Sequence, residues 1–470
     1  MRSYALSTTT RLSATVIAFA LGIGSLCASD WPGFRGSRGG VADDKDLPAQ
    51  WTSENVLWKI KLPGAGTSSP ITTGDKILVT VNAGYGTAIT KGMSGFGKGG
   101  GKGGFGKGTP NLAEQKKLKL LVLCLDRKDG SVVWQREVEP KLPETDFSGM
   151  MREHSYASST PVTDGKSVYV FFGKSGVHAF DLEGKKLWSA DVGSTTHMWG
   201  SAASPVLHKN LVIVNAAIES KTLIALDKTN GKELWRQKGL GTTWASPVVV
   251  ETKDGKHELV LNWPGKVVGY DPVTGKELWN CQGIGGAGGG GGFGGGGGGK
   301  GGFGGGFGAY TASTPVAKDG IVYIIGGGGP TTPATSLAIK TGGSGDVTKT
   351  HLVWKQKAGA TNCSPVLVGD HLCWVDGTVT CLKTTDGSVT YKERLYDARG
   401  EYVSAVAAGD KIFALTRYSG LFVLAGGAKF EKLGQFDFKG DSSVFNASPA
   451  ISDGRIYIRS NEYLYCVGKK

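Results

Sequence analysis

Residues 225–235 read ALDKTNGKELW, and versions of this stretch return along most of the chain. An apolar strand ends at Asp227, whose carboxylate can hydrogen-bond the backbone of the turn that follows. Gly231 can adopt the positive φ that a tight hairpin needs, and Trp235 offers a large flat surface for packing. One copy would indicate only an isolated hairpin, whereas regular copies indicate a repeat architecture.

Eight repeat units follow one another from residue 68 onward. In the clearest units a Ser-Pro or Thr-Pro pair starts a strand, a turn leads to a second apolar strand, and a third strand reaches the Asp and Gly turn before the tryptophan. In the sixth unit Tyr391 replaces the tryptophan, and the seventh unit has lost both the proline and the tryptophan. The units cover residues 68–134, 159–188, 203–235, 245–279, 313–354, 363–391, 404–436 and 447–467.

The first and the last strands each lack a partner in this scheme. The strand at residues 56–62 stands alone, and the eighth unit stops after three strands. Pairing them would close a ring without open edges, whereas an open solenoid would leave both defects unexplained. A spacing of about 40 to 45 residues also suits one four-stranded blade per unit. The sequence therefore predicts an all-β fold, an eight-bladed β-propeller of four-stranded antiparallel blades over residues 56–470, closed by the N-terminal strand.

The recurring Asp, Gly and Trp residues are interpreted as structural. We expect the tryptophans to pack between neighbouring blades, and the aspartates and glycines to shape the turns on which they pack. These blade-docking residues are Trp58, Asp126, Gly130, Trp134, Asp181, Gly184, Trp188, Asp227, Gly231, Trp235, Asp271, Gly275, Trp279 and Trp354.

The N-terminus has the pattern of a secretory signal peptide over residues 1–29. Arg2 and Arg11 precede an apolar run at 14–26, which is shorter than the roughly 20 residues of a membrane-spanning helix. Cys27 raises the alternative of a lipid-anchored protein, but that signal requires a small residue where Leu26 stands. We expect a soluble exported protein of the periplasm or cell envelope, with no transmembrane span and with a leader segment at residues 30–55.

The net charge of +13, from 53 Lys and Arg against 40 Asp and Glu, is unevenly distributed. Seven lysines lie between residues 91 and 119 with one acidic residue, Glu114, in or beside the insertion at 86–117. A basic nucleic-acid-binding face on the propeller is therefore not supported. This insertion and a second one at 283–309 are so rich in glycine that we expect both to be disordered loops.

Six cysteines follow the leader, and their spacing matches no zinc or CxxC motif. Most are expected to be buried thiols that behave as small hydrophobic residues, although export would permit disulfides. No metal site is predicted. The cysteines are Cys124, Cys281, Cys363, Cys373, Cys381 and Cys466.

The repeated motif resembles the tryptophan-docking motif AxDxxTGKxLW of the pyrroloquinoline quinone (PQQ) repeat family. The copies at 225–235 and 269–279 match it closely, those at 124–134 and 179–188 moderately, and those of the last four units weakly. This family includes quinoprotein alcohol dehydrogenases and the propeller lipoprotein of the bacterial outer-membrane β-barrel assembly machine. The resemblance implies an eight-bladed propeller and covers nearly all of the chain after residue 55.

The opening DWPGFRGSRGG at residues 30–40 is similar to a leader of planctomycete-type exported propellers of this family. Its Trp31, Phe34 and Arg35 would either cap one end of the ring or pack on a blade edge.

The resemblance leaves the cofactor open. The dehydrogenases that the chain resembles hold their quinone beside a disulfide between adjacent cysteines and bind calcium through Glu, Asn and Asp ligands. This chain has no adjacent cysteine pair and no recognisable cluster of such ligands. No cofactor and no catalytic residue are therefore predicted, and PQQ with calcium is the alternative.

Polar and aromatic residues recur in the loops that lead into the first strand of each unit. Because equivalent loops meet at one face of a ring, we expect these residues to line the mouth of the central channel, where aromatics and amides suit a sugar, a flat cofactor or a peptide. Ordinary packing of strand ends is the alternative. The candidate ligand-binding residues are His154, Tyr156, His197, Trp199, Trp244, Tyr310, Asn362, Tyr402 and Asn446.

These features predict a non-catalytic binding or assembly scaffold in the bacterial envelope, monomeric, with an envelope protein or a small ligand as its partner. A PQQ-dependent quinoprotein oxidoreductase and a carbohydrate-binding propeller are the alternatives.

Overall fold

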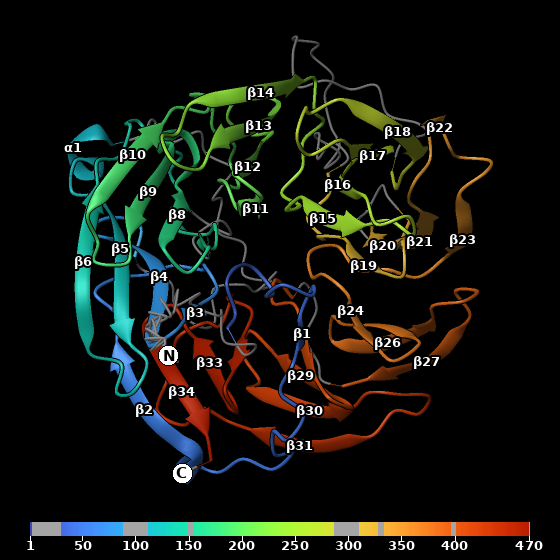
Figure 1. Ribbon diagram of the computed structural model, residues 1–470. Helices are drawn as coiled ribbons and strands as arrows, with labels where there is room; N and C mark the ends of the chain where they lie inside the picture. Colours follow the sequence, from blue (N-terminus) through green and yellow to red (C-terminus); the bar gives the residue numbers. More distant parts are fainter. Residues whose placement is uncertain are drawn as a thin grey trace, which may run out of the picture.

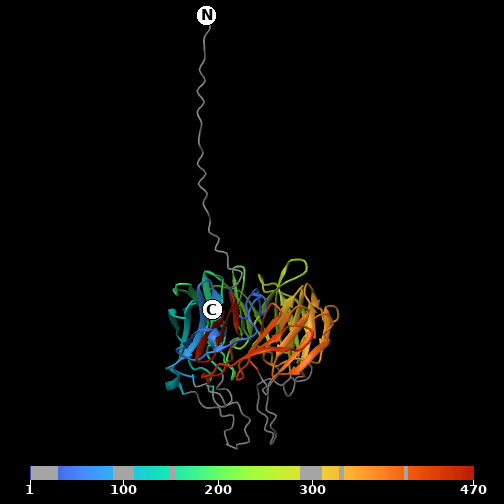
Figure 2. The same cartoon turned by 90° about the horizontal axis from the view of Figure 1, so that it is seen from below.

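The computed structural model describes Met1 and residues 30–87, 111–147, 154–285, 310–327, 333–395 and 401–469. Eight sheets stand around a central axis (Figure 1), and the ring forms a short cylinder when it is seen edge-on (Figure 2). The predicted eight-bladed propeller is confirmed. The expected signal peptide, apart from Met1, and most of the two glycine-rich insertions, residues 88–110 and 286–309, lie outside the described residues.

The eight blades follow the order of the chain. From its inner to its outer strand, blade one contains β3 (Ile71–Thr73), β4 (Lys76–Ala83), β5 (Lys119–Asp126) and β6 (Val132–Val138), and blade two contains β7 (Val162–Thr163), β8 (Ser167–Phe171), β9 (Val177–Asp181) and β10 (Lys186–Ala190). In the same direction, blade three contains β11 (Val206–His208), β12 (Leu211–Ala216), β13 (Thr222–Asp227) and β14 (Glu233–Lys238), and blade four contains β15 (Val248–Glu251), β16 (His257–Trp263), β17 (Lys266–Tyr270) and β18 (Glu277–Gln282).

The second half of the ring repeats this arrangement. Blade five contains β19 (Val316–Lys318), β20 (Ile321–Gly326), β21 (Thr335–Lys340) and β23 (Leu352–Gln356), and blade six contains β24 (Val366–Val368), β25 (His371–Val375), β26 (Thr378–Lys383) and β27 (Val389–Arg394). Blade seven contains β28 (Val406–Ala408), β29 (Lys411–Leu415), β30 (Leu421–Ala425) and β31 (Lys432–Phe436), and blade eight contains β32 (Ala450–Ser452), β33 (Arg455–Arg459), β34 (Tyr463–Gly468) and β2 (Val56–Lys61).

The ring closes where its first and last strands meet. β2 pairs antiparallel with β34, so that Trp58 lies opposite Cys466 and Lys61 lies opposite Tyr463. Figure 1 shows the blue strand β2 beside the red strand β34 at this seam. The N-terminal strand therefore completes the last blade, as the count of strands predicted.

Two short parallel strands extend the predicted blades. β1 (Val41–Ala42) pairs with the inner strand β28 of blade seven. β22 (Gly345–Asp346) comes from the long turn of blade five and pairs with the outer strand β18 of blade four. Each forms only two residue pairs, so neither has a periodic pattern that the sequence could reveal.

Helices contribute little to the described residues. The 3-10 helices η1 (Ser53–Asn55) and η3 (Gly173–Ser175) and the helix α1 (Leu112–Gln115) are each at most four residues long. α1 lies within the segment 86–117, so the last turn of that insertion before β5 is helical. No helix in the described residues is long and apolar enough to cross a membrane.

The hydrophobic core lies between neighbouring blades. Between blades three and four, Ile213 and Ala225 pack in one cluster with Leu259. The alternate residues Val212 and Val214 of the same strand β12 pack toward blade two. Because successive side chains of a strand point to opposite faces, both faces of each sheet are buried, and the strands read as nearly continuous apolar runs.

The repeated tryptophan packs on a glycine of the following blade. The Trp188 Nε1–H donates to the Lys228 carbonyl at 3.0 Å, and a Cβ atom on Gly231 would lie only 2.5 Å from the Trp188 ring. The loop therefore needs glycine for the close approach of the ring as well as for its φ of 74°. The pairs of this kind are Trp58 with Gly130, Trp134 with Gly184, Trp188 with Gly231, Trp235 with Gly275 and Trp354 with Gly387.

The aspartates that precede these glycines hold the turns. The carboxylate of each accepts a hydrogen bond from the backbone N–H two residues further on, at distances of 2.7 to 3.1 Å. This geometry is that of an Asx-turn, which explains the choice of Asp. The four residues are Asp126, Asp181, Asp227 and Asp271.

Trp279 departs from this pattern, although it also packs between two blades. The turn of blade five that faces it is longer, and the Trp279 Nε1–H donates to the Glu258 carboxylate of its own blade at 2.7 Å. The same carboxylate accepts from the Gly342 backbone N–H at 3.1 Å. Glu258 thus supplies the acceptor that a backbone carbonyl supplies at the other docking sites, and it joins blades four and five.

The cysteines include one disulfide. Cys373 on β25 and Cys381 on β26 are direct partners in the register of these strands and are bonded to each other. The other described cysteines, Cys124, Cys281, Cys363 and Cys466, are buried thiols. Most of the six are thus thiols, as expected, and the pairing of the other two follows from a strand register that spacing alone did not reveal.

Candidate functional site

A ring of hydrogen bonds joins the inner ends of the blades. The second residue before each inner strand is Ser or Thr. In blades one to seven its backbone N–H donates to the hydroxyl of the equivalent residue in the next blade. These bonds are 2.9 to 3.0 Å long. The donors run in order from Ser69 through Thr160, Ser204, Ser246, Thr314 and Ser364 to Ser404, whose acceptor is Ser448.

A different contact spans the junction of blades eight and one. Arg459 of β33 is fully buried, and its Nη1 donates to the carbonyls of Ser68 and Thr80 at 3.0 and 2.7 Å. Burial lowers the pKa of this guanidinium to about 9. At this junction Arg459 therefore takes the place of the hydrogen bond between a backbone N–H and a hydroxyl that joins the other neighbouring blades.

The leader crosses the axis of the ring, because it contacts blade one and also reaches the opposite blade five, where Gly39 lies against Val316. Trp31 exchanges hydrogen bonds with Thr72 of blade one, and the Pro32 carbonyl accepts from Thr163 of blade two. On the other side, Arg35 donates to the Ala405 carbonyl at 3.1 Å, next to β1 on blade seven. Of the two arrangements considered for the leader, a cap across the channel fits these contacts better than packing on a blade edge.

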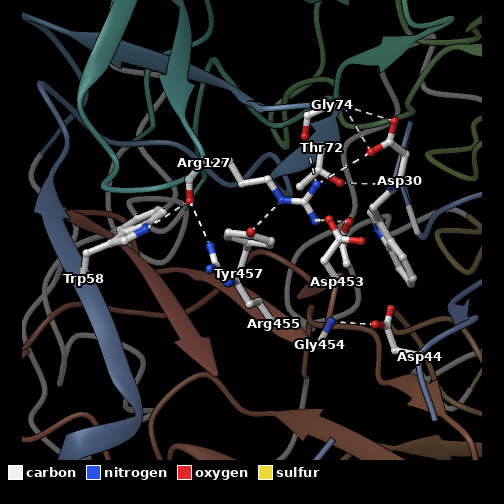
Figure 3. A network of polar contacts seen from close by, with 12 residues as sticks. Asp30, Asp44, Trp58, Thr72, Gly74, Arg127, Asp453, Gly454, Arg455 and Tyr457 are labelled. Carbon is white, nitrogen blue, oxygen red and sulfur yellow. Dashed lines mark hydrogen bonds and ion pairs between the residues drawn. The ribbon is translucent and has the colours of Figure 1, made fainter. Parts of the chain in front are cut away.

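Arg127 ties the leader to the closing seam, as Figure 3 shows. Its Nε donates to the Tyr457 hydroxyl of blade eight at 2.8 Å, and its Nη1 donates to the Gly74 carbonyl of blade one at 2.9 Å. The guanidinium also pairs with Asp453 at 2.8 Å and lies 3.8 Å from the carboxylate of Asp30. One nearly buried side chain thus joins the leader and blade one to blade eight.

The channel contains a cavity of about 220 Å³. Phe34 of the leader lines it, together with the serines and threonines of the hydrogen-bonded ring. The remaining lining comes mainly from the loops that lead into the inner strands. Seven of the nine candidate residues lie here: His154, Trp199, Trp244, Tyr310, Asn362, Tyr402 and Asn446.

The other two candidates, Tyr156 and His197, line a separate cavity of about 20 Å³. Sequence reasoning missed Phe34 as a lining residue of the large cavity, because nothing in the leader shows where it enters the ring. It also missed the hydroxyl side chains, although the recurring Ser-Pro and Thr-Pro pairs were visible and were interpreted only as strand starts.

The aromatic residues of the cavity pack against one another. Tyr310 meets Trp199 edge to face, with ring centroids 4.7 Å apart, and it meets Trp244 at 5.7 Å. His154 lies 5.8 Å from the ring of Tyr402. The Arg417 guanidinium lies 4.4 Å from the centroid of the Tyr402 ring, in cation–π contact with it. The wall of the cavity therefore consists of aromatic rings in mutual contact.

The described lining of the cavity is uncharged near neutral pH. Burial, with a smaller effect of His197, lowers the pKa of His154 to about 4, so that its imidazole is neutral. Burial raises the pKa of Tyr402 to about 12 and also raises that of Tyr310. No Asp, Glu, Lys or Arg is among the described residues that line this cavity.

Calcium with PQQ does not fit this donor set. Calcium prefers several oxygen ligands, with carboxylates prominent among them, and the described lining offers the amides Asn362 and Asn446 instead. The disulfide among the described cysteines joins β25 and β26 rather than adjacent cysteines, and neither of its cysteines lines the cavity. In the part of the chain that the structure describes, no group of three or more His, Cys, Asp or Glu residues could hold a metal ion.

A buried carboxyl group, Glu219, and a half-buried one, Glu144, lie at the small cavity. Glu219 accepts a hydrogen bond from the Ser201 hydroxyl and is almost fully buried. Burial raises its pKa to about 7, and the pKa of Glu144, which lines the small cavity, rises to about 7 for the same reason.

Solved structures show the same fold in proteins of different activity. BamB from Moraxella catarrhalis aligns with a TM-score of 0.55 at 14% identity, over 88% of this chain and 99% of that chain. Quinohemoprotein alcohol dehydrogenase from Comamonas testosteroni aligns with a TM-score of 0.58 at 11% identity, over 95% of this chain and 82% of that chain. At these identities the likeness shows the fold alone.

The sequence comparisons are more specific. A curated relative, the outer membrane protein assembly factor BamB of Kangiella koreensis, is 29% identical over 134 residues, which are 27% of this chain. The match spans only 32% of the length of that relative. Residues 119–393, more than half of the chain, match the family model described as outer membrane protein assembly factor BamB. The chain therefore belongs to the BamB family of propeller proteins.

Proposed function

We propose that this protein is a non-catalytic binding scaffold that takes part in protein assembly in the bacterial envelope. The observation that carries the proposal is the family match over residues 119–393, which runs from blade one through blade six. The matched family and the curated relative bear the name of an outer membrane protein assembly factor. The expected signal peptide at residues 1–29 would bring the chain to the same compartment.

The outer wall of the ring offers a surface on which a partner could dock. The residue before several docking tryptophans is apolar and faces outward: Val133, Leu187 and Leu234 are 50%, 44% and 50% exposed. Their neighbours Trp134, Trp188 and Trp235 point inward and are buried, since successive residues of a strand alternate. The docking motif thus presents an apolar side chain at the same place on three successive blades.

Crosslinking in intact bacterial cells that produce the full chain tests the proposal. We expect a short-range crosslinker to join the protein to an outer membrane protein or to another assembly component. A Leu187→Ser, Leu234→Ser double variant should reduce that product, because it removes two of the three outward apolar contacts. Val273→Ser is the matched control, since Val273 is also 50% exposed but lies in a turn rather than on an outer strand. Recovery of the wild-type protein alone, with no crosslinked partner, would contradict the scaffold function.

Titration with PQQ and calcium separates this proposal from an oxidoreductase. Because the cavity lacks carboxylate ligands among its described residues, we expect no saturable change in the absorbance of the quinone. Saturable binding would contradict the non-catalytic assignment. Light scattering during gel filtration checks the expected monomer, and fractionation of the producing cells checks the envelope location.

A further inference from the structure

Several polar groups in the large cavity are not used by the fold. The hydroxyls of Tyr310 and Tyr402, the amide of Asn362 and the imidazole of His154 form no hydrogen bond with any described residue. They lie in loops that lead to four different blades, yet they line one cavity. Packing alone would be served equally well by phenylalanine or leucine at these positions, so the convergence of free hydrogen-bonding groups indicates a ligand.

The wall around these groups is aromatic. Trp199 and Trp244 both pack edge to face against Tyr310, and Phe34 lines the same cavity. Aromatic rings bind the C–H faces of a ligand, while the free hydroxyl, amide and imidazole groups can each donate and accept hydrogen bonds. A ring with apolar faces and a rim of hydroxyl groups satisfies both kinds of surface at once. That combination is the chemistry of a pyranose sugar.

The charge of the lining and the size of the cavity restrict the class of ligand further. An ionised ligand would lose its hydration in a cavity whose described lining holds no charged side chain to replace it. The volume of about 220 Å³ is smaller than typical pockets for drug-sized ligands, which begin at about 300 Å³. It suits one sugar ring rather than a chain. Because the leader crosses the ring, the sugar has to enter through the mouth that the candidate residues line.

We propose that the central cavity binds a single neutral sugar residue, free or at the end of a glycan, with Tyr310, Tyr402, Asn362 and His154 as its hydrogen-bonding groups. This site lies on the axis of the ring and is independent of the outer wall invoked for the scaffold. Failure of either proposal leaves the other intact, because one is read out by sugar binding and the other by crosslinking.

Calorimetric titration of the mature chain with simple sugars tests the site. The probes are methyl β-glucoside and methyl N-acetyl-β-glucosaminide as neutral ligands, with methyl β-glucuronide and glucosamine as charged relatives of similar size. We expect at least one neutral probe to saturate with a millimolar dissociation constant, and the charged probes to bind roughly tenfold more weakly or not at all. If no neutral probe saturates, or if a charged probe binds as tightly, the proposal is wrong.

Two conservative variants locate the bound sugar. Tyr310→Phe and Tyr402→Phe each keep the aromatic ring and remove one hydroxyl, so each should weaken binding roughly three- to tenfold. Folding should be unaffected, because neither hydroxyl is bonded to a described residue. Tyr463→Phe is the control, since Tyr463 lies on β34 and does not line the cavity. Wild-type affinity in both cavity variants would place the sugar elsewhere and overturn the assignment.

Discussion

The docking of Trp188 on Gly231 can be tested by adding a single methyl group. Gly231→Ala places a Cβ atom 2.5 Å from the Trp188 ring, closer than non-bonded carbon atoms approach. The control is Gly239→Ala in the same blade. Gly239 has a φ of 83°, close to the 74° of Gly231, but a Cβ atom there would meet nothing within 4 Å. The two variants therefore share the backbone strain and differ in the contact with the tryptophan.

The expected losses of stability follow from the backbone strain and from the contact with the tryptophan. A positive φ costs alanine about 1–2 kcal/mol relative to glycine, and the stiffer unfolded chain offsets about 0.4–1 kcal/mol of that. Gly239→Ala should therefore lower the free energy of unfolding by about 1 kcal/mol. At Gly231 the ring of Trp188 must also move, which adds about 1–3 kcal/mol for overpacking. The total for Gly231→Ala is about 2–4 kcal/mol.

Urea unfolding followed by circular dichroism measures the difference in the free energy of unfolding between the two variants. We expect both variants to keep the wild-type slope with urea concentration, and the midpoint of Gly231→Ala to fall well below that of Gly239→Ala. Equal midpoints would refute the interpretation, because the tryptophan contact would then contribute nothing beyond the backbone conformation.

Three further predictions concern the seam, the buried acid and the disulfide. Arg127→Met removes the hydrogen bond to the Tyr457 hydroxyl and the positive charge beside the Asp30 carboxylate, so the free energy of unfolding should fall by about 2–4 kcal/mol; an unchanged urea midpoint would contradict this. Burial raises the pKa of Glu219 from 4.5 to about 7, so the stability that its protonation contributes is complete below pH 4.5 and is lost as the pH rises through 7. In Glu219→Gln the urea midpoint should therefore decline less steeply between pH 4.5 and 7 than in the wild type. An equally steep decline in both proteins would show that Glu219 does not cause it. In unfolded, unreduced protein, alkylation and mass spectrometry should find Cys373 and Cys381 unlabelled, and labelling of both would exclude the disulfide.

The fold could be predicted because its signal is repeated. Asp, Gly and Trp recur at nearly constant spacing, and each copy describes the same contact between two blades, so weak copies are supported by strong ones. The closure of the ring followed from counting strands: one strand was unpaired at the start and one was missing at the end. That argument depends on hydrogen-bond pairing, which every strand requires, and not on any particular residue.

Contacts that occur once could not be predicted in this way. Trp279 looks like the other docking tryptophans, but its acceptor is Glu258, a residue outside the motif. The disulfide between Cys373 and Cys381 depends on the register of two strands.

The candidate site was partly accessible because its residues occupy equivalent positions before the inner strands, and seven of nine meet in one cavity. Tyr156 and His197 belong to the same loops, but they turn to the small cavity between blades. The sequence shows which loop a residue belongs to, whereas the direction of its side chain depends on local packing that the sequence does not reveal.

The pairing of β2 with β34 has a consequence for how the molecule folds. These strands are separated by almost the whole chain, so the blades between them must form before the ring can close, and such distant pairings form slowly. During that interval both strands are unpaired sheet edges. When two unfinished chains meet, the N-terminal strand of each can complete the last blade of the other, giving a strand-swapped dimer. The yield of monomeric protein on refolding should therefore fall as the protein concentration rises.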